Sequence, residues 1–193
     1  VEVDLTPGIK PPIIIVGLPD VSVQESRERV QSAIRNTGLE YPRKRVRVNL
    51  APATVRKEGS AYDLPIALGI LIANRQLPPA CLQDALVMGE LSLDGSVRHI
   101  RGVLPMAAVA RNEGVKRVYV PAEDAPEAAI FPDLEVIPVN SLAELYQHLT
   151  GQVIIPPQPP LIAEQVEVQV LTDFREIKGQ EHVKRALEVA AAG

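Results

Sequence analysis

One stretch constrains the fold more than any other. Residues 63–74 read Asp-Leu-Pro-Ile-Ala-Leu-Gly-Ile-Leu-Ile-Ala-Asn and carry no charge after Asp63. A helix that is apolar on every side has to be buried on most sides. The run therefore predicts a buried central helix over residues 61–74. Two helix starts are open, because Ser60 with Asp63 fits a capping box, whereas Asp63 followed by Pro65 fits a start three residues later.

The segments before this helix follow strand and helix periodicities. Residues 1–5 alternate apolar and acidic side chains, which predicts a half-buried strand, and the apolar run at 12–16 predicts a short, fully covered one. Ser22 and Glu25 are spaced as a capping box that opens a helix. Residues 43–50 alternate arginine with valine and leucine, which predicts a strand with one apolar and one positive face.

The second half of the chain predicts a layered α/β arrangement. Residues 86–93 and 96–100 flank Asp94-Gly95, which predicts a hairpin with a tight turn. Strand patterns then alternate with helix patterns, which is typical of an α/β domain. The predicted strands are 116–120 and 134–139, and the predicted helices are 104–112, 123–130 and 141–149.

Charge is distributed unevenly along the chain. The segment from 27 to 57 holds nine basic residues against Glu28 and Glu40, a local charge of +7, so a net charge of −4 leaves −11 for the remainder. Such asymmetry indicates either a surface for an anionic partner or a solvated face with local ion pairs. An aromatic content of 3% argues against base stacking as the binding mode. The nine are Arg27, Arg29, Arg35, Arg43, Lys44, Arg45, Arg47, Arg56 and Lys57.

The sequence favours neither a metal-binding site nor a membrane-spanning segment. Cys81 is the only cysteine, and His99, His148 and His182 are widely scattered, which does not match metal-ligand spacing. The chain has no long apolar run and no signal-peptide pattern, so we expect a soluble, cytoplasmic protein.

Several segments together resemble a known family. Three of them are similar to the Lon-protease-type domain: 46–68, 89–95 and 102–121. Three shorter ones are similar to the amino-terminal domain of the ComM/YifB family, a magnesium-chelatase-like group: 17–20, 49–53 and 57–60. Residues 173–193 resemble the beginning of that family's AAA+ ATPase module.

The resemblance implies an architecture and a set of partners. It implies a two-layer α/β fold, with helices packed on a mixed sheet, over residues 1–150. A proline-rich linker at 151–170 and the start of the AAA+ module at 171–193 would follow. Family membership implies a homo-hexameric ATPase associated with DNA branch migration in natural transformation, using ATP and magnesium. No Gly-x-x-x-x-Gly-Lys-Ser/Thr loop occurs here, so we expect neither a cofactor nor ATP hydrolysis in this chain itself.

The resemblance also locates the positions of a protease dyad. Lon-type proteases use a serine activated by a lysine. Aligning Gly59 with the family's glycine places Ala61 at the nucleophile position and Leu104 at the lysine position. Ser60 lies one residue early, about 100° away around a helix. We therefore expect no enzyme activity; the alternatives are a residual Ser-Lys peptidase centred on Ser60 and a magnesium-chelatase-type subunit.

The arginine strand is the candidate binding surface. Arg43, Arg45 and Arg47 share one face of the predicted strand, and Arg56 and Lys57 follow in the next loop. Spaced cations of this kind suit sequence-independent contact with DNA phosphates. The same surface could instead meet a neighbouring subunit, and the sequence leaves both readings open.

Overall fold

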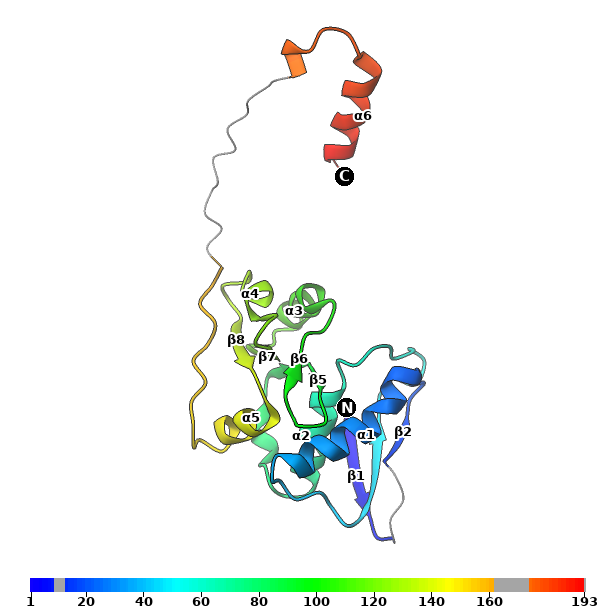
Figure 1. The fold of residues 1–193 in the computed structure, drawn as a ribbon, viewed down its shortest axis with the longest axis vertical. Coiled ribbons are helices and arrows are strands. Elements are labelled where there is room, and N and C mark those ends of the chain that lie inside the picture. The colour runs from blue at the N-terminus through cyan, green and yellow to red at the C-terminus, as the bar shows by residue number, and fades with distance from the viewer. Residues whose placement is uncertain (9–12, 162–173, 193) are drawn as a thin grey trace. The chain divides into compact units, whose positions relative to one another are not determined.

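The computed structural model describes residues 1–8, 13–161 and 174–192 (Figure 1). The chain divides into two compact units, Val1–Leu161 and Ile162–Gly193, and each is described by itself. Unit 1 holds the sheets and five α-helices of the described residues, and unit 2 holds one α-helix.

The first sheet has three strands in the order β1-β3-β2. Strand β1 (Glu2–Thr6) is antiparallel to β3 (Arg45–Asn49), and β2 (Ile14–Val16) is parallel to it. The predicted alternation of β3 is confirmed, because Val46 and Val48 are buried while Arg47 is exposed.

Strand β2 is less covered than predicted. The apolar run predicted a strand buried on both faces, yet Ile14 and Val16 are exposed at 37% and 43%. The reason is that β2 is an edge strand, and these two side chains pair in register with β3 on the face that carries Arg47. Within the described part of this run, Ile13 turns fully toward the core and Ile15 does so in part.

Helix α1 (Val21–Asn36) connects β2 to β3 and begins differently from the prediction. Its N-cap is Asp20, whose Oδ1 accepts a hydrogen bond from the Val23 amide at 2.8 Å. The predicted Ser22–Glu25 capping box is therefore wrong. Asp20 takes the role because its second oxygen also accepts from the Gly59 amide at 3.1 Å, a tertiary contact that the local pattern does not contain.

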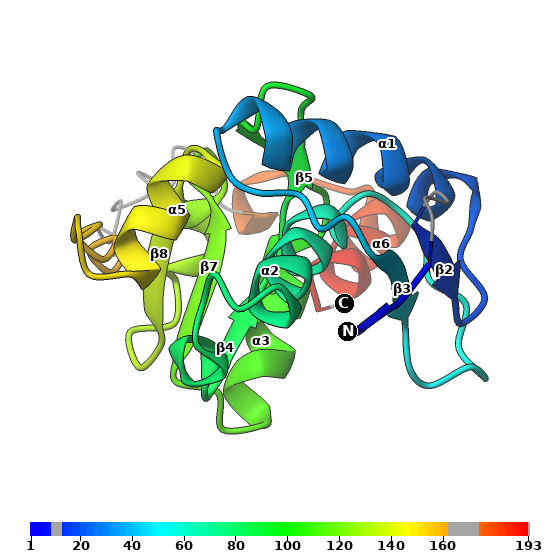
Figure 2. The ribbon, with the colours of Figure 1, turned by 90° about the horizontal axis from the view of Figure 1, so that it is seen from below.

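Helix α2 (Asp63–Ala73) lies at the centre of unit 1, as predicted (Figure 2). Its apolar side chains Leu64, Ile66, Leu68, Ile70 and Leu71 are fully buried. Both predicted side-chain caps are wrong: the N-cap is Tyr62, which uses no side chain, and Asp63 points its carboxylate elsewhere.

The second sheet is parallel, with strands β4 (Ala85–Val87), β7 (Arg117–Pro121) and β8 (Glu135–Val139) in that order. Strands β5 (Glu90–Leu91) and β6 (Val97–Arg98) form the predicted hairpin. The single strand predicted over 86–93 is divided in two.

Gly89 explains that division. Its amide donates to the Ala61 carbonyl at 3.1 Å, and its own carbonyl accepts from the Leu64 amide at 3.0 Å. The backbone between β4 and β5 is thus joined to the start of α2 instead of continuing a ladder.

Four further helices complete unit 1: a 3-10 turn at Pro79–Leu82, α3 (Val103–Asn112), α4 (Ala125–Ala128) and α5 (Leu142–Leu149). Two apolar cores lie on opposite faces of the second sheet. Tyr119 of β7 points into the core shared with α1, α2 and α5, whereas Val118 and Val120 point into the core shared with α3 and α4. The protein thus has the predicted α/β architecture with helices packed on mixed sheets.

Residues 151–161 belong to unit 1. Ile155 is 4% exposed, the Gln158 amide donates to the Val136 carbonyl at 2.8 Å, and the Leu161 amide donates to the Ala129 carbonyl at 3.0 Å. The predicted linker boundary at 150/151 is therefore displaced to Leu161. Its remaining part, through 170, lies outside the described residues.

Unit 2 contains a 3-10 turn at Phe174–Glu176 and helix α6 (Glu181–Ala192). Helix α6 carries Val183 and Leu187, and both side chains are exposed. Among the described residues, no helix has the length and hydropathy needed to cross a membrane.

Candidate functional site

The start of α2 is where the Lon-type resemblance places a nucleophile. Gly59 has a φ of +83°, which favours glycine, and the Ser60 carbonyl accepts from the Asp63 amide at 3.1 Å. Ala61 is half-buried against the core of α3 and α4. The Leu104 amide, in the first turn of α3, donates to Glu127 Oε1 at 3.2 Å. The side chains at the two dyad positions are a methyl and an isobutyl group, which can neither attack nor transfer a proton.

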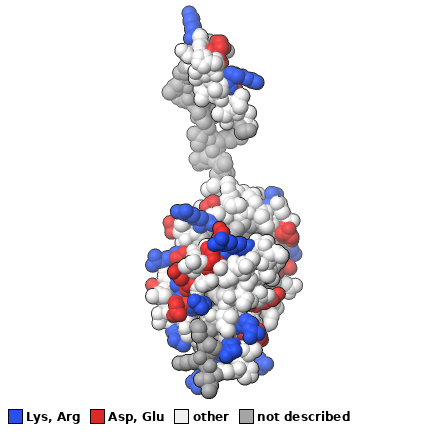
Figure 3. All heavy atoms as spheres, turned by 90° about the vertical axis from the view of Figure 1, so that its right-hand side faces the viewer, with Lys and Arg blue, Asp and Glu red and all other residues white. Residues whose placement is uncertain are grey.

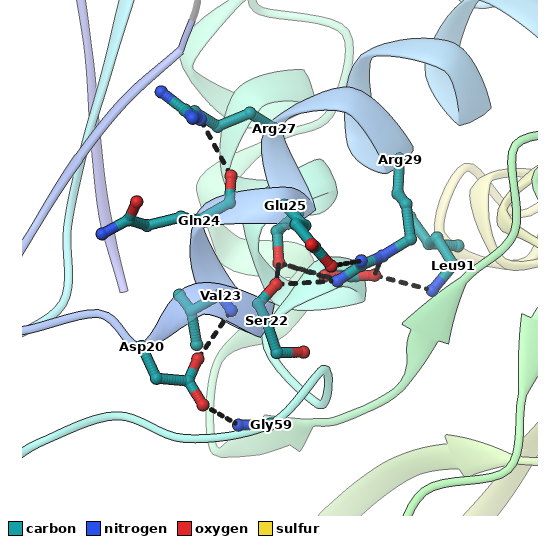
Figure 4. A network of polar contacts seen from close by, with 11 residues as sticks. Asp20, Ser22, Val23, Gln24, Glu25, Arg27, Arg29, Gly59 and Leu91 are labelled. Atoms are coloured by element: carbon teal, nitrogen blue, oxygen red, sulfur yellow. Dashed lines mark hydrogen bonds and ion pairs between the residues drawn. The ribbon is translucent and has the colours of Figure 1, made fainter.

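Asp63 is the centre of a buried polar network, and its partners Arg29 and Leu91 are labelled in Figure 4. Its carboxylate is fully buried and accepts from Arg29 Nε at 2.6 Å, from the Leu91 amide at 3.1 Å and from the Ser26 hydroxyl. The hydrogen bond to Asp63 raises the pKa of the Arg29 guanidinium, which therefore stays positively charged. A buried charge needs such partners. The network ties α1, α2 and β5 together, and sequence reasoning missed it because its members are far apart in the chain.

Lys57 occupies an unexpected position. It is 5% exposed, and its ammonium donates to the Val55 carbonyl at 2.7 Å and to the Pro52 carbonyl. Its backbone also joins the loop before α1, because the Lys57 amide donates to the Leu18 carbonyl at 3.1 Å. The prediction that Lys57 is a solvent-facing cation is therefore wrong; it holds the loop at 51–58 together from inside.

The arginine face of β3 is shared with acids. In register, Arg47 lies opposite Asp4 of β1 on one side and Ile14 of β2 on the other. Directly opposed residues have Cβ atoms about 4.5–5.5 Å apart, so Asp4 reduces the positive potential of Arg47. The next row places Glu2 opposite Asn49, with Glu2 Oε2 accepting from Asn49 Nδ2 at 2.7 Å.

The other predicted cations are distributed around this face. Arg43 is exposed just before β3, and Arg45 is half-buried. Arg56, with a side chain 70% exposed, pairs with Glu58 at 3.3 Å, a surface contact of little energetic weight. Basic and acidic side chains are interleaved on the side of the molecule drawn in Figure 3. Three of the five predicted residues are therefore exposed: Arg43, Arg47 and Arg56.

A second polar pair, His99 and Asp124, was not foreseen from the sequence. His99 Nδ1 contacts Asp124 Oδ1, and the buried Asp124 also accepts from the Ile100 amide at 3.0 Å. The hydrogen bond to Asp124 raises the pKa of His99. The two are 25 positions apart, and the turn after β7 brings them together. Among the described residues, no three His, Cys, Asp or Glu side chains gather as metal ligands would.

A surface hollow of about 560 Å³ lies between β1 and the end of α2. It carries cations and an acid together, and the C-terminal end of a helix presents partial negative charge. That combination is a poor fit for a phosphate-bearing cofactor. The hollow is lined by Val3, Asp4, Leu5, Lys44, Ala73, Asn74 and Arg75.

Comparison with known proteins supplies relatives over the whole chain. The family model described as subunit ChlI of Mg-chelatase matches residues 1–124. Competence protein ComM of Haemophilus influenzae is 39% identical over 196 residues, covering 100% of this chain and 38% of the relative. Protein YifB of Escherichia coli, described as uncharacterized, is 37% identical over 193 residues, covering 100% of this chain and 37% of the relative.

A more distant similarity connects the chain to proteases. Lon protease of Rhizobium meliloti is 27% identical over 135 residues, which cover 66% of this chain and 16% of that protein. The chain spans well under half the length of the curated relatives it matches.

Proposed function

The chain belongs to the family of subunit ChlI of Mg-chelatase, in its ComM/YifB branch, and on that premise we propose that it is the non-catalytic amino-terminal domain of a DNA-acting AAA+ motor. The outer face of β3 makes sequence-independent contacts with DNA phosphates. The whole protein assembles as a homo-hexamer whose AAA+ module binds ATP and magnesium. One of its relatives carries the name competence protein, which fits a role on DNA.

The proposed DNA contact rests on the exposure of three arginines, Arg43, Arg47 and Arg56. Arginine binds phosphate in any sequence context, and each neutralised phosphate makes the affinity depend more steeply on salt. Asp4 opposite Arg47 and Glu58 beside Arg56 weaken this attraction, so a single copy binds DNA with modest affinity. In a six-fold ring the weak sites add, because linked sites raise the effective concentration.

A DNA titration tests this proposal. Fluorescence anisotropy with a labelled random-sequence duplex is recorded across a range of salt concentrations. The variant Arg43→Ala/Arg47→Ala/Arg56→Ala binds DNA more weakly, and the slope of log K against log salt flattens by roughly 0.9 for each phosphate that is no longer neutralised.

The control removes the same number of exposed arginines from the β6–α3 side, as Arg98→Ala/Arg101→Ala/Arg111→Ala, and keeps the parent's affinity and slope. Lys57 is retained in both variants because it is buried. Parent-like binding by the first variant would rule out the arginine face as the DNA contact.

A residual peptidase is the competing function, and its one candidate nucleophile is Ser60. Ala61 and Leu104 at the dyad positions argue against it. A serine-reactive fluorophosphonate probe separates the two functions. Under the proposal the chain stays unlabelled, and labelling that disappears in Ser60→Ala would establish the peptidase instead.

A further inference from the structure

A segment after α5 lies beside β8 without belonging to a helix or a strand (Figure 1). We call residues 152–161 the strap. Its amides at Gln158 and Leu161 donate to carbonyls of β8 and of the residue after α4, at 2.8 and 3.0 Å. Proline has no N–H to donate, so the four prolines of the strap add no such bond. The strap is therefore attached to unit 1 at separate points along its length.

One of these points buries a side chain and depends on a histidine. Ile155 is 4% exposed and packs into the core that contains α2 and Tyr119, whereas the other strap side chains are exposed or half-buried. The Ile155 amide donates to His148 Nδ1 at 3.0 Å. This acceptor differs from a backbone carbonyl because a proton can occupy it.

The surroundings of His148 keep its imidazole neutral. Its ring lies in the last turn of α5 and meets the buried Tyr119 ring edge-on, with centroids 5.9 Å apart. Burial and then Arg117 of β7 lower the pKa of His148, whereas Glu135 of β8 and Glu144 of α5 act in the opposite direction. Arg117 and Glu135 pair with each other at 2.6 Å, which reduces the influence of both. The strap itself contains no titratable side chain.

Protonation of His148 removes the reason for Ile155 to stay in place. It puts an N–H on Nδ1 directly opposite the Ile155 N–H, so an acceptor becomes a second donor. It also creates a charged ring that is partly desolvated and faces Arg117. Both costs are relieved when Ile155 leaves the core, because water then reaches the imidazole.

We propose that His148 is a proton-controlled latch: when its imidazole is protonated, the strap leaves unit 1 while the sheets and helices of unit 1 stay folded. The strap leads directly to unit 2 along the chain, so its release lengthens the covalent connection between the two units. In the proposed function that connection joins the amino-terminal domain to its motor. The latch itself does not depend on DNA contact, and its test uses no DNA.

Amide hydrogen exchange of the full chain tests the latch. Rates are measured by NMR from about pH 8 to about pH 5 and corrected for the intrinsic effect of pH. The Gln158 and Leu161 amides report release of the whole strap, because their acceptors are backbone carbonyls and not His148. Leu68, in the middle of α2, reports whether the core stays closed.

The expected result is a loss of protection confined to the strap. The open population rises about tenfold per pH unit as the pH falls from 6.5 toward the folded pKa of His148. Gln158 and Leu161 therefore lose protection together with Ile155, over the pH range in which the His148 imidazole titrates. Leu68 keeps its protection over the same range.

Three variants separate the latch from a general effect of acid. His148→Asn supplies an amide oxygen that cannot be protonated in this range, so the strap stays protected in acid. His99→Asn is the matched control at a histidine away from the strap, and it keeps the parent's response. Ile155→Ala removes the buried anchor without changing His148, so the strap amides are unprotected already at neutral pH while Leu68 stays protected.

The proposal is wrong if Ile155 alone responds to acid while Gln158 and Leu161 stay protected, since the effect would then be local. It is also wrong if His148→Asn responds as the parent does. Loss of Leu68 protection together with the strap, in acid or in Ile155→Ala, overturns it as well, because the strap would then be an inseparable part of the core.

Discussion

Arg29 on α1 and Asp63 at the first position of α2 form an ion pair in which Nε and Oδ2 lie 2.6 Å apart. The Asp63 side chain is completely buried, and the Arg29 side chain is 20% exposed. The contact joins two helices whose apolar faces build one core. Removing one partner of a buried pair leaves an uncompensated charge, and this is costlier than losing a surface pair.

Asp63→Ala is therefore expected to reduce the free energy of unfolding by about 3–5 kcal/mol, because Arg29 and the Leu91 amide lose their acceptor. Urea denaturation followed by circular dichroism measures the change. The control is Asp133→Ala, which breaks a half-exposed pair with Arg111 and should cost about 1 kcal/mol or less. Equal losses in the two variants would contradict the structural role of Asp63.

Lys57 and Arg56 are neighbours with opposite environments, so the same substitution should affect them differently. Lys57→Met leaves the Val55 and Pro52 carbonyls without their donor and is expected to cost about 1–3 kcal/mol. Arg56→Met removes an exposed pair with Glu58 and should leave stability within about 0.5 kcal/mol. Thermal unfolding of both variants checks this. A Lys57→Met protein as stable as its parent would mean that the ammonium does not support the loop.

Gly69 in the middle of α2 lies against Val3 of β1. A Cβ added to Gly69 would come within 2.6 Å of Val3 Cγ2. Alanine improves helix propensity by about 1 kcal/mol, whereas overpacking a core costs about 1–3 kcal/mol, so we expect Gly69→Ala to be net destabilising. The double variant Val3→Ala/Gly69→Ala should remove the clash, so Gly69→Ala becomes neutral or stabilising in that background. Denaturant unfolding of all four proteins gives the coupling, and additive effects would contradict it.

His99 and His148 should titrate on opposite sides of the ordinary histidine pKa of 6.5. The hydrogen bond to Asp124 raises the pKa of His99, so its contribution to stability is complete below 6.5 and is lost as the pH rises through the folded value. Burial lowers the pKa of His148, so the folded state resists its protonation. The contribution of His148 to stability is complete above pH 6.5 and decreases as the pH falls below that value.

Proton NMR titration of the imidazole signals, assigned with His99→Gln and His148→Gln, measures both values. The Ile155 amide donates to His148 Nδ1 at 3.0 Å, which requires that nitrogen to be unprotonated. Once the effect of pH on the intrinsic exchange rate is removed, hydrogen exchange at Ile155 should therefore become less protected in acid. Two histidines with the same pKa would contradict these environments.

Local spacing alone determined much of the secondary structure. The lack of charge after Asp63 predicted a buried α2, and the arginine–valine alternation predicted the two faces of β3. Such patterns suffice because the periodicity of a helix or a strand determines which residues lie on the same side of it. The resemblance carried by short segments around Gly59 likewise led to the family without any structure.

The tertiary structure determines which groups contact each face of these helices and strands. Asp4 opposes Arg47 only because β1 pairs with β3, and Lys57 is buried only because its own loop folds over it. The sequence position of Asp63 predicted a helix cap, but its carboxylate accepts a hydrogen bond from Arg29 of α1 instead. The sign of each charge can be read from the sequence. Which group pairs with that charge, and how far its side chain is exposed, depend on segments distant in the chain that folding brings together.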